Sequence, residues 1–237
     1  CALLAIGIHA SHAQSLIVDT DQVKQAIEKG AILWDARSTA EYAEGHIPGA
    51  VNFGPAGSVF RDPIREDPPS AAAASQLFGQ AGIDFLRRDV IVYTREGDPI
   101  AYYAARMLEY YGGAFGKVYH GGLDAWKAGG YPVSTQPTRL APVTLDLSTA
   151  GAGTISTKDV IGLAQKGGAQ LLDVRSPKEF GGDDIRAIRG GHITGAVNIP
   201  YEQNWKDPAT GTKLAAQQVK TREGMSLKPT SLLKSLY

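Results

Sequence analysis

A long phrase occurs twice in this chain of 237 residues. Residues 31–54 read AILWDARSTAEYAEGHIPGAVNFG, and residues 169–200 read AQLLDVRSPKEFGGDDIRAIRGGHITGAVNIP. The recurring positions are Asp35, Arg37, Ser38, Glu41, Gly45, His46, Ile47, Gly49, Ala50, Val51 and Asn52, which return as Asp173, Arg175, Ser176, Glu179, Gly191, His192, Ile193, Gly195, Ala196, Val197 and Asn198. A repeat of this length is hard to obtain by chance, so it predicts two copies of one domain.

The composition is that of a globular protein able to bury a core, with 43% hydrophobic and 20% charged residues. Lys and Arg together number 24, as do Asp and Glu. Because there is no basic excess or cluster, we expect neither nucleic acid nor an anionic membrane surface as a partner. Nothing in the sequence implies an oligomer or a cofactor, and we expect a monomer without one.

Disulfides and metal sites are also disfavoured. Cys1 is the single cysteine, which excludes a disulfide framework within one chain. The histidines are His9, His12, His46, His120 and His192, and no two of them have a metal-ligand spacing.

The first residues resemble the end of a secretory signal. Residues 1–10 are apolar, and Ser11 and Ala13 fit a signal-peptidase site after Ala13. A first core strand or helix is the alternative, whereas a membrane span needs about 20 apolar residues. We therefore expect residues 1–13 to be a signal-peptide remnant, which implies a periplasmic or secreted protein.

Strands and helices are expected to alternate after this segment. Buried strands are predicted at residues 31–34, 50–53, 89–93, 117–119 and 170–172, with helices near 20–29, 71–78, 99–111, 123–127, 158–166 and 229–237. Residues 55–69 are interpreted as a loop. This order predicts an α/β fold in which each domain is a mostly parallel sheet with helices on both faces. We place domain 1 at 16–135, a linker at 136–153 and domain 2 at 154–237.

The repeated phrase resembles the signature of rhodanese-like domains. Residues 119–126 (YHGGLDAW) and 130–133 (GYPV) are similar to the usual end of such a domain. Two such domains in tandem resemble thiosulfate or 3-mercaptopyruvate sulfurtransferases. This resemblance implies a catalytically silent first domain and a catalytic cysteine in the second. Asp35 to His46 spans 11 positions and Asp173 to His192 spans 19, and the extra residues, around 183–189, fall where the family's second domain has an insertion.

The signature residues are interpreted mainly as structural. Asp35 ends a buried strand, where its carboxylate needs donors such as those of Arg37. His46 and His192 are expected to pin a tight loop by hydrogen bonds, with proton transfer as the alternative.

The resemblance implies that a cysteine thiolate takes sulfur from a donor and carries it as a persulfide. That cysteine opens a C-x-x-G-x-[RST] loop between a central strand and a helix, where inward N–H groups stabilise anionic sulfur. In the first repeat the loop is Thr94, Arg95, Glu96, Gly97, Asp98 and Pro99. Thr94 stands at the cysteine position and cannot hold a persulfide, so we expect domain 1 not to transfer sulfur.

The equivalent loop of the second repeat is expected at about position 240. Asp35 and Thr94 are 59 positions apart. The same interval plus the eight-residue insertion, counted from Asp173, gives this position. We therefore expect the chain to be a fragment of a longer protein, inactive by itself, whose domain 2 cysteine follows Tyr237.

The sulfur donor is open between thiosulfate, mercaptopyruvate and a protein persulfide. Where vertebrate-type thiosulfate enzymes have an anion-binding arginine, Glu179 stands in this chain. Arg186 and Arg189 are the nearest candidate cations for substrate binding, and solvated loop charges are the alternative. Two other functions compete: a non-catalytic binding or interaction protein, and a phosphatase or arsenate reductase, which the short spacing from Thr94 to Gly97 disfavours.

Overall fold

The computed structural model describes residues 16–64, 67–114, 116–149, 154–167, 169–186 and 188–236. The expected signal-peptide remnant at residues 1–13, with Cys1, His9 and His12, lies outside the described residues.

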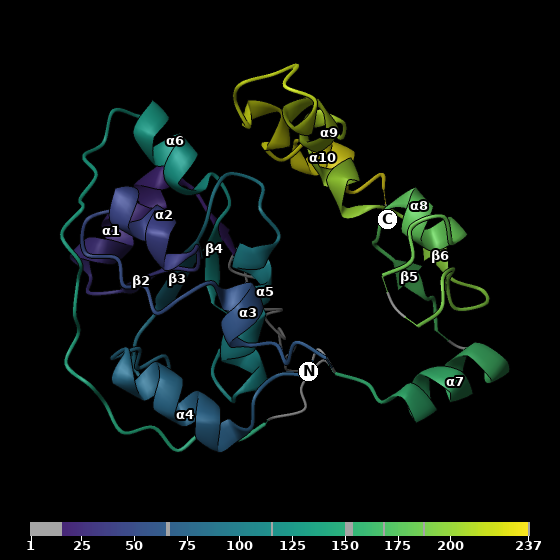
Figure 1. Cartoon of the computed structure of the whole chain (residues 1–237), viewed down its shortest axis with the longest axis horizontal. Coiled ribbons are helices and arrows are strands. Elements are labelled where there is room, and N and C mark those ends of the chain that lie inside the picture. The colour runs from purple at the N-terminus through teal and green to yellow at the C-terminus, as the bar shows by residue number, and fades with distance from the viewer. Residues whose placement is uncertain are drawn as a thin grey trace, which may run out of the picture.

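The first repeat is built on a four-stranded parallel sheet (Figure 1). Its strands, in spatial order, are β1 (Ile17–Val18), β4 (Lys117–Tyr119), β3 (Val90–Tyr93) and β2 (Ile32–Asp35). Every residue of β3 is buried between two neighbours, as its continuous apolar run predicts. Strand β1 was not expected, because two apolar residues carry no periodicity of their own.

Helices cover both faces of this sheet, so the predicted α/β class is confirmed. One face holds α3 (Ala56–Val59), α4 (Ala71–Gln80) and α5 (Ile100–Tyr110), and the other holds α1 (Thr20–Glu28), α2 (Thr39–Glu44) and α6 (Gly122–Ala128). Successive strand residues point to opposite faces. Trp34 and Val92 therefore enter the first core, and Leu33 and Ile91 enter the second.

Two expectations about residues 50–69 were wrong. Instead of a strand at 50–53, only Val51 pairs with the sheet, through an isolated bridge to Trp34. Strand pairing stops there because the next residue, Asn52, turns its side-chain amide to the backbone carbonyls of Asp35 and Arg37. The expected loop at 55–69 contains helix α3, which follows Pro55.

The described part of the expected linker, residues 136–149, packs on domain 1. Leu145 and Leu147 are buried in the core beneath α4. The N–H of Val143 donates to the carbonyl of Gly79 at 2.9 Å, and that of Leu147 to the hydroxyl of Ser75 at 3.1 Å. Isolated leucines in a Pro-rich segment carry no periodic signal, so the sequence did not indicate this packing.

The second repeat reproduces the start of the same pattern. Its elements are α7 (Thr157–Lys166), β5 (Leu172–Asp173), α8 (Pro177–Gly181), β6 (Val197–Asn198), the 3₁₀ turns η1 (Tyr201–Asn204) and η2 (Glu223–Met225), α9 (Thr210–Ala215) and α10 (Thr230–Leu233). Strands β5 and β6 pair in parallel. Among the described residues from 154 onward, only Trp205, Thr210 and Met225 are buried. The repeated phrase is therefore buried in the first copy and largely exposed in the second.

Candidate functional site

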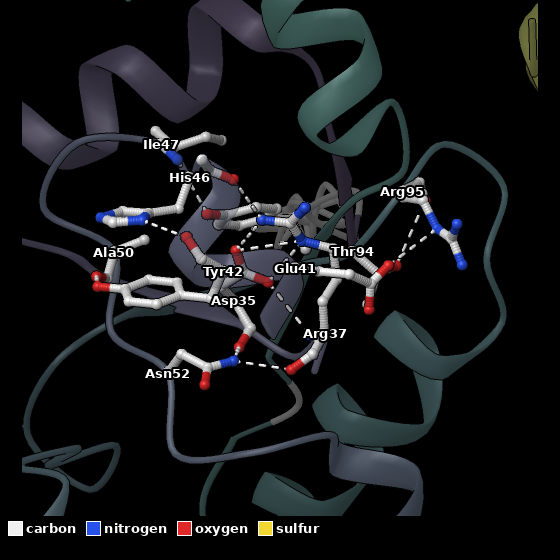
Figure 2. A network of polar contacts seen from close by, with 12 residues as sticks. Asp35, Arg37, Glu41, Tyr42, His46, Ile47, Ala50, Asn52, Thr94 and Arg95 are labelled. Carbon is white, nitrogen blue, oxygen red and sulfur yellow. Dashed lines mark hydrogen bonds and ion pairs between the residues drawn. The ribbon is translucent and has the colours of Figure 1, made fainter. Parts of the chain in front are cut away.

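A network of polar contacts forms where strand β2 ends (Figure 2). The carboxylate of Asp35 is fully buried, and Arg37 meets it in a fork, with Nε 2.9 Å from Oδ1 and Nη2 2.6 Å from Oδ2. The backbone N–H of Arg37 adds a third donor at 3.1 Å. Burial alone would lower the pKa of the Arg37 guanidinium, but its hydrogen bonds to Asp35 and the charge of that carboxylate raise this pKa above its ordinary value. The buried charges are thus paired.

The same fork also organises the loop that follows α2. Nη2 of Arg37 donates to the carbonyl of Gly45 at 2.8 Å, which holds the start of the loop at residues 45–54. Asn52 closes the loop from its other side, since its amide donates to the carbonyls of Asp35 at 2.9 Å and Arg37 at 2.7 Å. Asn52 was assigned no role from the sequence, although its return as Asn198 was a signal.

His46 lies fully buried in this loop. Its Nδ1 is 2.8 Å from the carbonyl of Tyr42 and its Nε2 is 3.1 Å from that of Gln136. The imidazole stacks on the ring of Tyr42, with centroids 3.7 Å apart. Each ring nitrogen thus lies within hydrogen-bonding distance of a backbone carbonyl, and the residue ties α2 to the segment after domain 1.

The second copy has the same geometry in a different environment. Nη2 of Arg175 is 2.6 Å from Oδ2 of Asp173 and 2.8 Å from the carbonyl of Gly191. His192 stacks on Phe180 and places Nδ1 2.9 Å from its carbonyl. The Arg175 side chain, however, is 44% exposed, against 6% for Arg37. The phrase therefore encodes its own hydrogen bonds, whereas burial is supplied by the rest of the domain.

The loop at 94–99 lies between β3 and α5, as the resemblance implied. Thr94 is buried at the end of β3. Its hydroxyl makes a hydrogen bond of 3.3 Å to the carbonyl of Arg95. The guanidinium of Arg95 points outward and pairs with Glu41 of α2 at 3.5 Å (Figure 2).

Three backbone donors of this loop, and the first donor of α5, are already taken. The N–H of Glu96 donates to the Asp124 carboxylate at 2.8 Å, and that of Gly97 to the His120 carbonyl at 3.1 Å. The N–H of Asp98 donates to the carbonyl of Arg95, and the carboxylate of Asp98 accepts a hydrogen bond from the N–H of Ile100. Pro99 has no N–H. An incoming anion would find none of these four donors free. Asp124 and His120 were not expected to contact the loop, because they lie more than 20 residues further along the chain.

The two expected substrate cations of the second repeat lie on its surface. Arg186 is 71% exposed and pairs with Asp184 at 2.9 Å and with Glu179 at 3.6 Å. Arg189 is also exposed. Within the residues that the structure describes, no three potential metal ligands come together, and no helix is long and apolar enough to cross a bilayer.

Comparison with known proteins matches both repeats to the same family. The family model of the rhodanese-like domain matches residues 19–129 and again residues 156–227. The chain belongs to the rhodanese-like family. Two segments of this rhodanese-like chain thus match one domain model, in keeping with the two copies of the phrase.

Its curated relatives include bacterial thiosulfate sulfurtransferases. The one from Azotobacter vinelandii is 32% identical over 203 residues, which cover 84% of this chain and 73% of the relative. The one from Corynebacterium glutamicum is 33% identical over 180 residues, covering 70% of this chain and 57% of that protein. The chain thus spans only part of the length of these relatives.

Solved structures show the same fold. The 3-mercaptopyruvate sulfurtransferase SseA of Escherichia coli superposes with a TM-score of 0.76 at 23% identity, covering 94% of this chain and 82% of that one. The 3-mercaptopyruvate sulfurtransferase of Leishmania major gives a TM-score of 0.72 at 19% identity, covering 95% and 62%. At this level of identity the likeness concerns the fold.

Proposed function

We propose that this chain is part of a sulfurtransferase that moves a sulfane sulfur from thiosulfate or 3-mercaptopyruvate to a thiophilic acceptor. One observation carries the proposal: 84% of the chain aligns, at 32% identity, with a curated thiosulfate sulfurtransferase. Function depends on sites rather than on folds, so the location of the nucleophile decides how the proposal is tested.

The proposed nucleophile is a cysteine of the second repeat that follows Tyr237. Its thiolate attacks the outer sulfur of the donor and forms an S–S bond, and the bond between that sulfur and the rest of the donor breaks. Sulfite leaves when the donor is thiosulfate. When the donor is 3-mercaptopyruvate, the electron pair of the broken C–S bond stays on carbon, and the enolate of pyruvate leaves and takes up a proton. Cyanide or a thiolate then takes the outer sulfur from the persulfide, which regenerates the thiolate. The proposal is supported by the length of the Azotobacter relative, of which this chain spans 73%.

The first repeat is proposed to be catalytically silent. Thr94 stands at the nucleophile position, and a threonine hydroxyl has no appreciable ionised fraction near neutral pH. The internal use of the loop's donors by Asp124, His120 and the loop itself supports the same view. Residues 1–237 alone are accordingly proposed to be inactive.

A cyanolysis assay tests both statements. The natural protein and the chain of residues 1–237 are incubated with cyanide and either thiosulfate or 3-mercaptopyruvate, and thiocyanate is measured. We expect turnover with at least one donor for the natural protein and none for residues 1–237. Turnover by residues 1–237 that survives Cys1→Ser would contradict the silent first repeat.

A non-catalytic interaction protein is the second candidate. It is favoured by the same Thr94 loop, in which a threonine stands where the family resemblance places the nucleophile. The assay separates the two candidates, because the absence of thiocyanate from the natural protein with either donor would leave only the second.

Export is a further part of the proposal. It rests on the apolar run and the small residues Ser11 and Ala13 near the start of the sequence. Cell fractionation with amino-terminal sequencing of the mature protein tests it. A mature protein that starts at Gln14 in the exported fraction supports export, and a protein confined to the cytoplasm contradicts it.

A further inference from the structure

A short segment of the second repeat lies against the silent loop of the first. We call this segment, residues 222–227, the strap, and it includes the 3₁₀ turn η2. Its central side chain, Met225, is only 3% exposed. Met225 packs on Gly97, the glycine of the loop at 94–99, which has a φ of +71°. A Cβ placed on Gly97 would overlap the Cβ of Met225, so glycine is needed there for packing as well as for its backbone conformation.

Glu96 of the loop binds the strap on both sides of Met225. Nε of Arg222 donates to the Glu96 carbonyl at 2.6 Å. The hydroxyl of Ser226 donates to Oε1 of the Glu96 side chain at 2.5 Å. The two hydrogen bonds join residues 126 and 130 positions apart, so they depend on how the two repeats pack together.

His120 makes a third polar contact, and the partners of its two ring nitrogens determine its tautomer. Its Nε2 is 2.8 Å from the carbonyl of Met225, which can only accept, so Nε2 carries a hydrogen. Its Nδ1, 2.8 Å from the hydroxyl of Tyr102, then accepts from that hydroxyl in the neutral ring. Tyr102 and His120 thus form a chain of two hydrogen bonds that ends on the strap.

The strap is held in shape by its own repeat. The N–H of Lys206 donates to the carbonyl of Ser226 at 2.8 Å, and that of Asp207 donates to the carbonyl of Gly224 at 2.9 Å. Trp205 pairs with Leu227 in an isolated antiparallel bridge. The second repeat therefore presents the strap as an ordered surface.

We propose that the loop at 94–99 has become an intramolecular receptor for the strap, which docks the second repeat on the first. In place of an anion, the loop holds the thioether side chain of Met225, and the contacts of Glu96 and His120 fix its position. This role concerns the described residues alone and does not depend on the proposed sulfur transfer.

The two methionines of the chain allow a direct test. Hydrogen peroxide transfers one oxygen atom to a methionine Sδ and leaves as water, and the rate follows exposure of the sulfur. Met107 is buried in the core of domain 1 and reports on the integrity of that domain. Met225 reports on docking. Peptide mass spectrometry on the full chain follows both rates at once, and the unfolded chain supplies the unprotected rate.

Gly97→Ala is the first variant, and Gly130→Ala is its matched control. Both glycines have a positive φ, but a Cβ on Gly130 meets no atom within 4 Å. We expect Met225 to be protected in the unaltered chain and in Gly130→Ala, and to oxidise about tenfold faster or more in Gly97→Ala, as overpacking predicts. Met107 should keep its rate in all three.

A second pair of variants changes the strap alone. Arg222→Ala combined with Ser226→Ala removes two polar contacts without altering domain 1, and Glu223→Ala on the exposed side of the strap is its control. We expect faster oxidation of Met225 in the double variant only. The proposal is overturned if Met225 in the unaltered chain oxidises at the unprotected rate. It is equally overturned if the double variant leaves the Met225 rate unchanged.

Discussion

Arg37 meets Asp35 in a two-nitrogen fork that is closed to solvent, with Nη2 2.6 Å from Oδ2. The identical fork between Arg175 and Asp173 stands at the surface of the second repeat. One chain thus contains the same ion pair in two environments, which separates the effect of burial from that of geometry.

This pair of forks predicts different costs for the same substitution. Arg37→Ala leaves a buried carboxylate without its partner and should lower the free energy of unfolding by about 3–5 kcal/mol. Arg175→Ala, its matched control, removes a pair whose arginine is 44% exposed and should cost about 1 kcal/mol or less. Urea unfolding of the two variants measures both values. Equal losses would show that burial does not determine the strength of the fork.

Docking of the strap should weaken in acid because of His120. Burial, with a smaller contribution from the charge of Arg222, lowers the pKa of His120 below its ordinary value, although the hydrogen bond to Met225 opposes this. The neutral ring is favoured when the strap is docked. The stabilisation is therefore present above the ordinary pKa of about 6.5 and is lost as the pH falls through the lowered value.

Oxidation of Met225 measures this pH dependence. Its rate, relative to that of Met107, should rise between about pH 7.5 and about pH 5 in the unaltered chain. The control is His120→Gln, which cannot titrate and should leave the ratio much less dependent on pH. A ratio with the same pH dependence in both proteins would assign the effect to another group.

A thiol introduced at position 94 should not give the first repeat sulfur-transfer activity. In Thr94→Cys, made together with Cys1→Ser, the loop donors remain bound to Asp124, His120 and the loop itself. Burial and the carboxylates of Glu96 and Asp98 should keep the thiol pKa at or above its ordinary value of about 8.5. Thiolate absorbance against pH and the cyanolysis assay check this. An ionised thiol at about pH 6 or a persulfide in the mass spectrum would contradict the closed loop.

The segment after domain 1 should contribute to the stability of that domain. Leu147→Ala removes a side chain that is buried beneath α4, and should cost about 2–4 kcal/mol. Val133→Ala, at a side chain that is 45% exposed, is the control and should cost less than about 1 kcal/mol. Thermal or urea unfolding measures both. Equal small effects would show that residues 136–149 behave as a free linker.

Much of the first domain could be predicted from local signals. The continuous run of β3, the helix that follows Pro99 and the contact of Arg37 with Asp35 each depend on residues close together in sequence. The strand predicted at residues 50–53 failed because Asn52 bonds to the backbone of Asp35, 17 residues earlier, and ends the pairing. The burial of Leu145 and Leu147 could not be predicted, since it depends on the distant helix α4.

The sequence by itself determined the repeated scaffold and the likeness to rhodanese-like domains, and it led to the prediction that Thr94 stands at the family's cysteine position. These are properties of residue identity and of short spacing. Only the tertiary structure decided that the arginine of one fork is buried and that of its copy exposed, and that Met225 packs on Gly97 of the first repeat's loop. The reason is that burial and docking arise between residues far apart in sequence, which the order of the strands and the packing of the two repeats bring together.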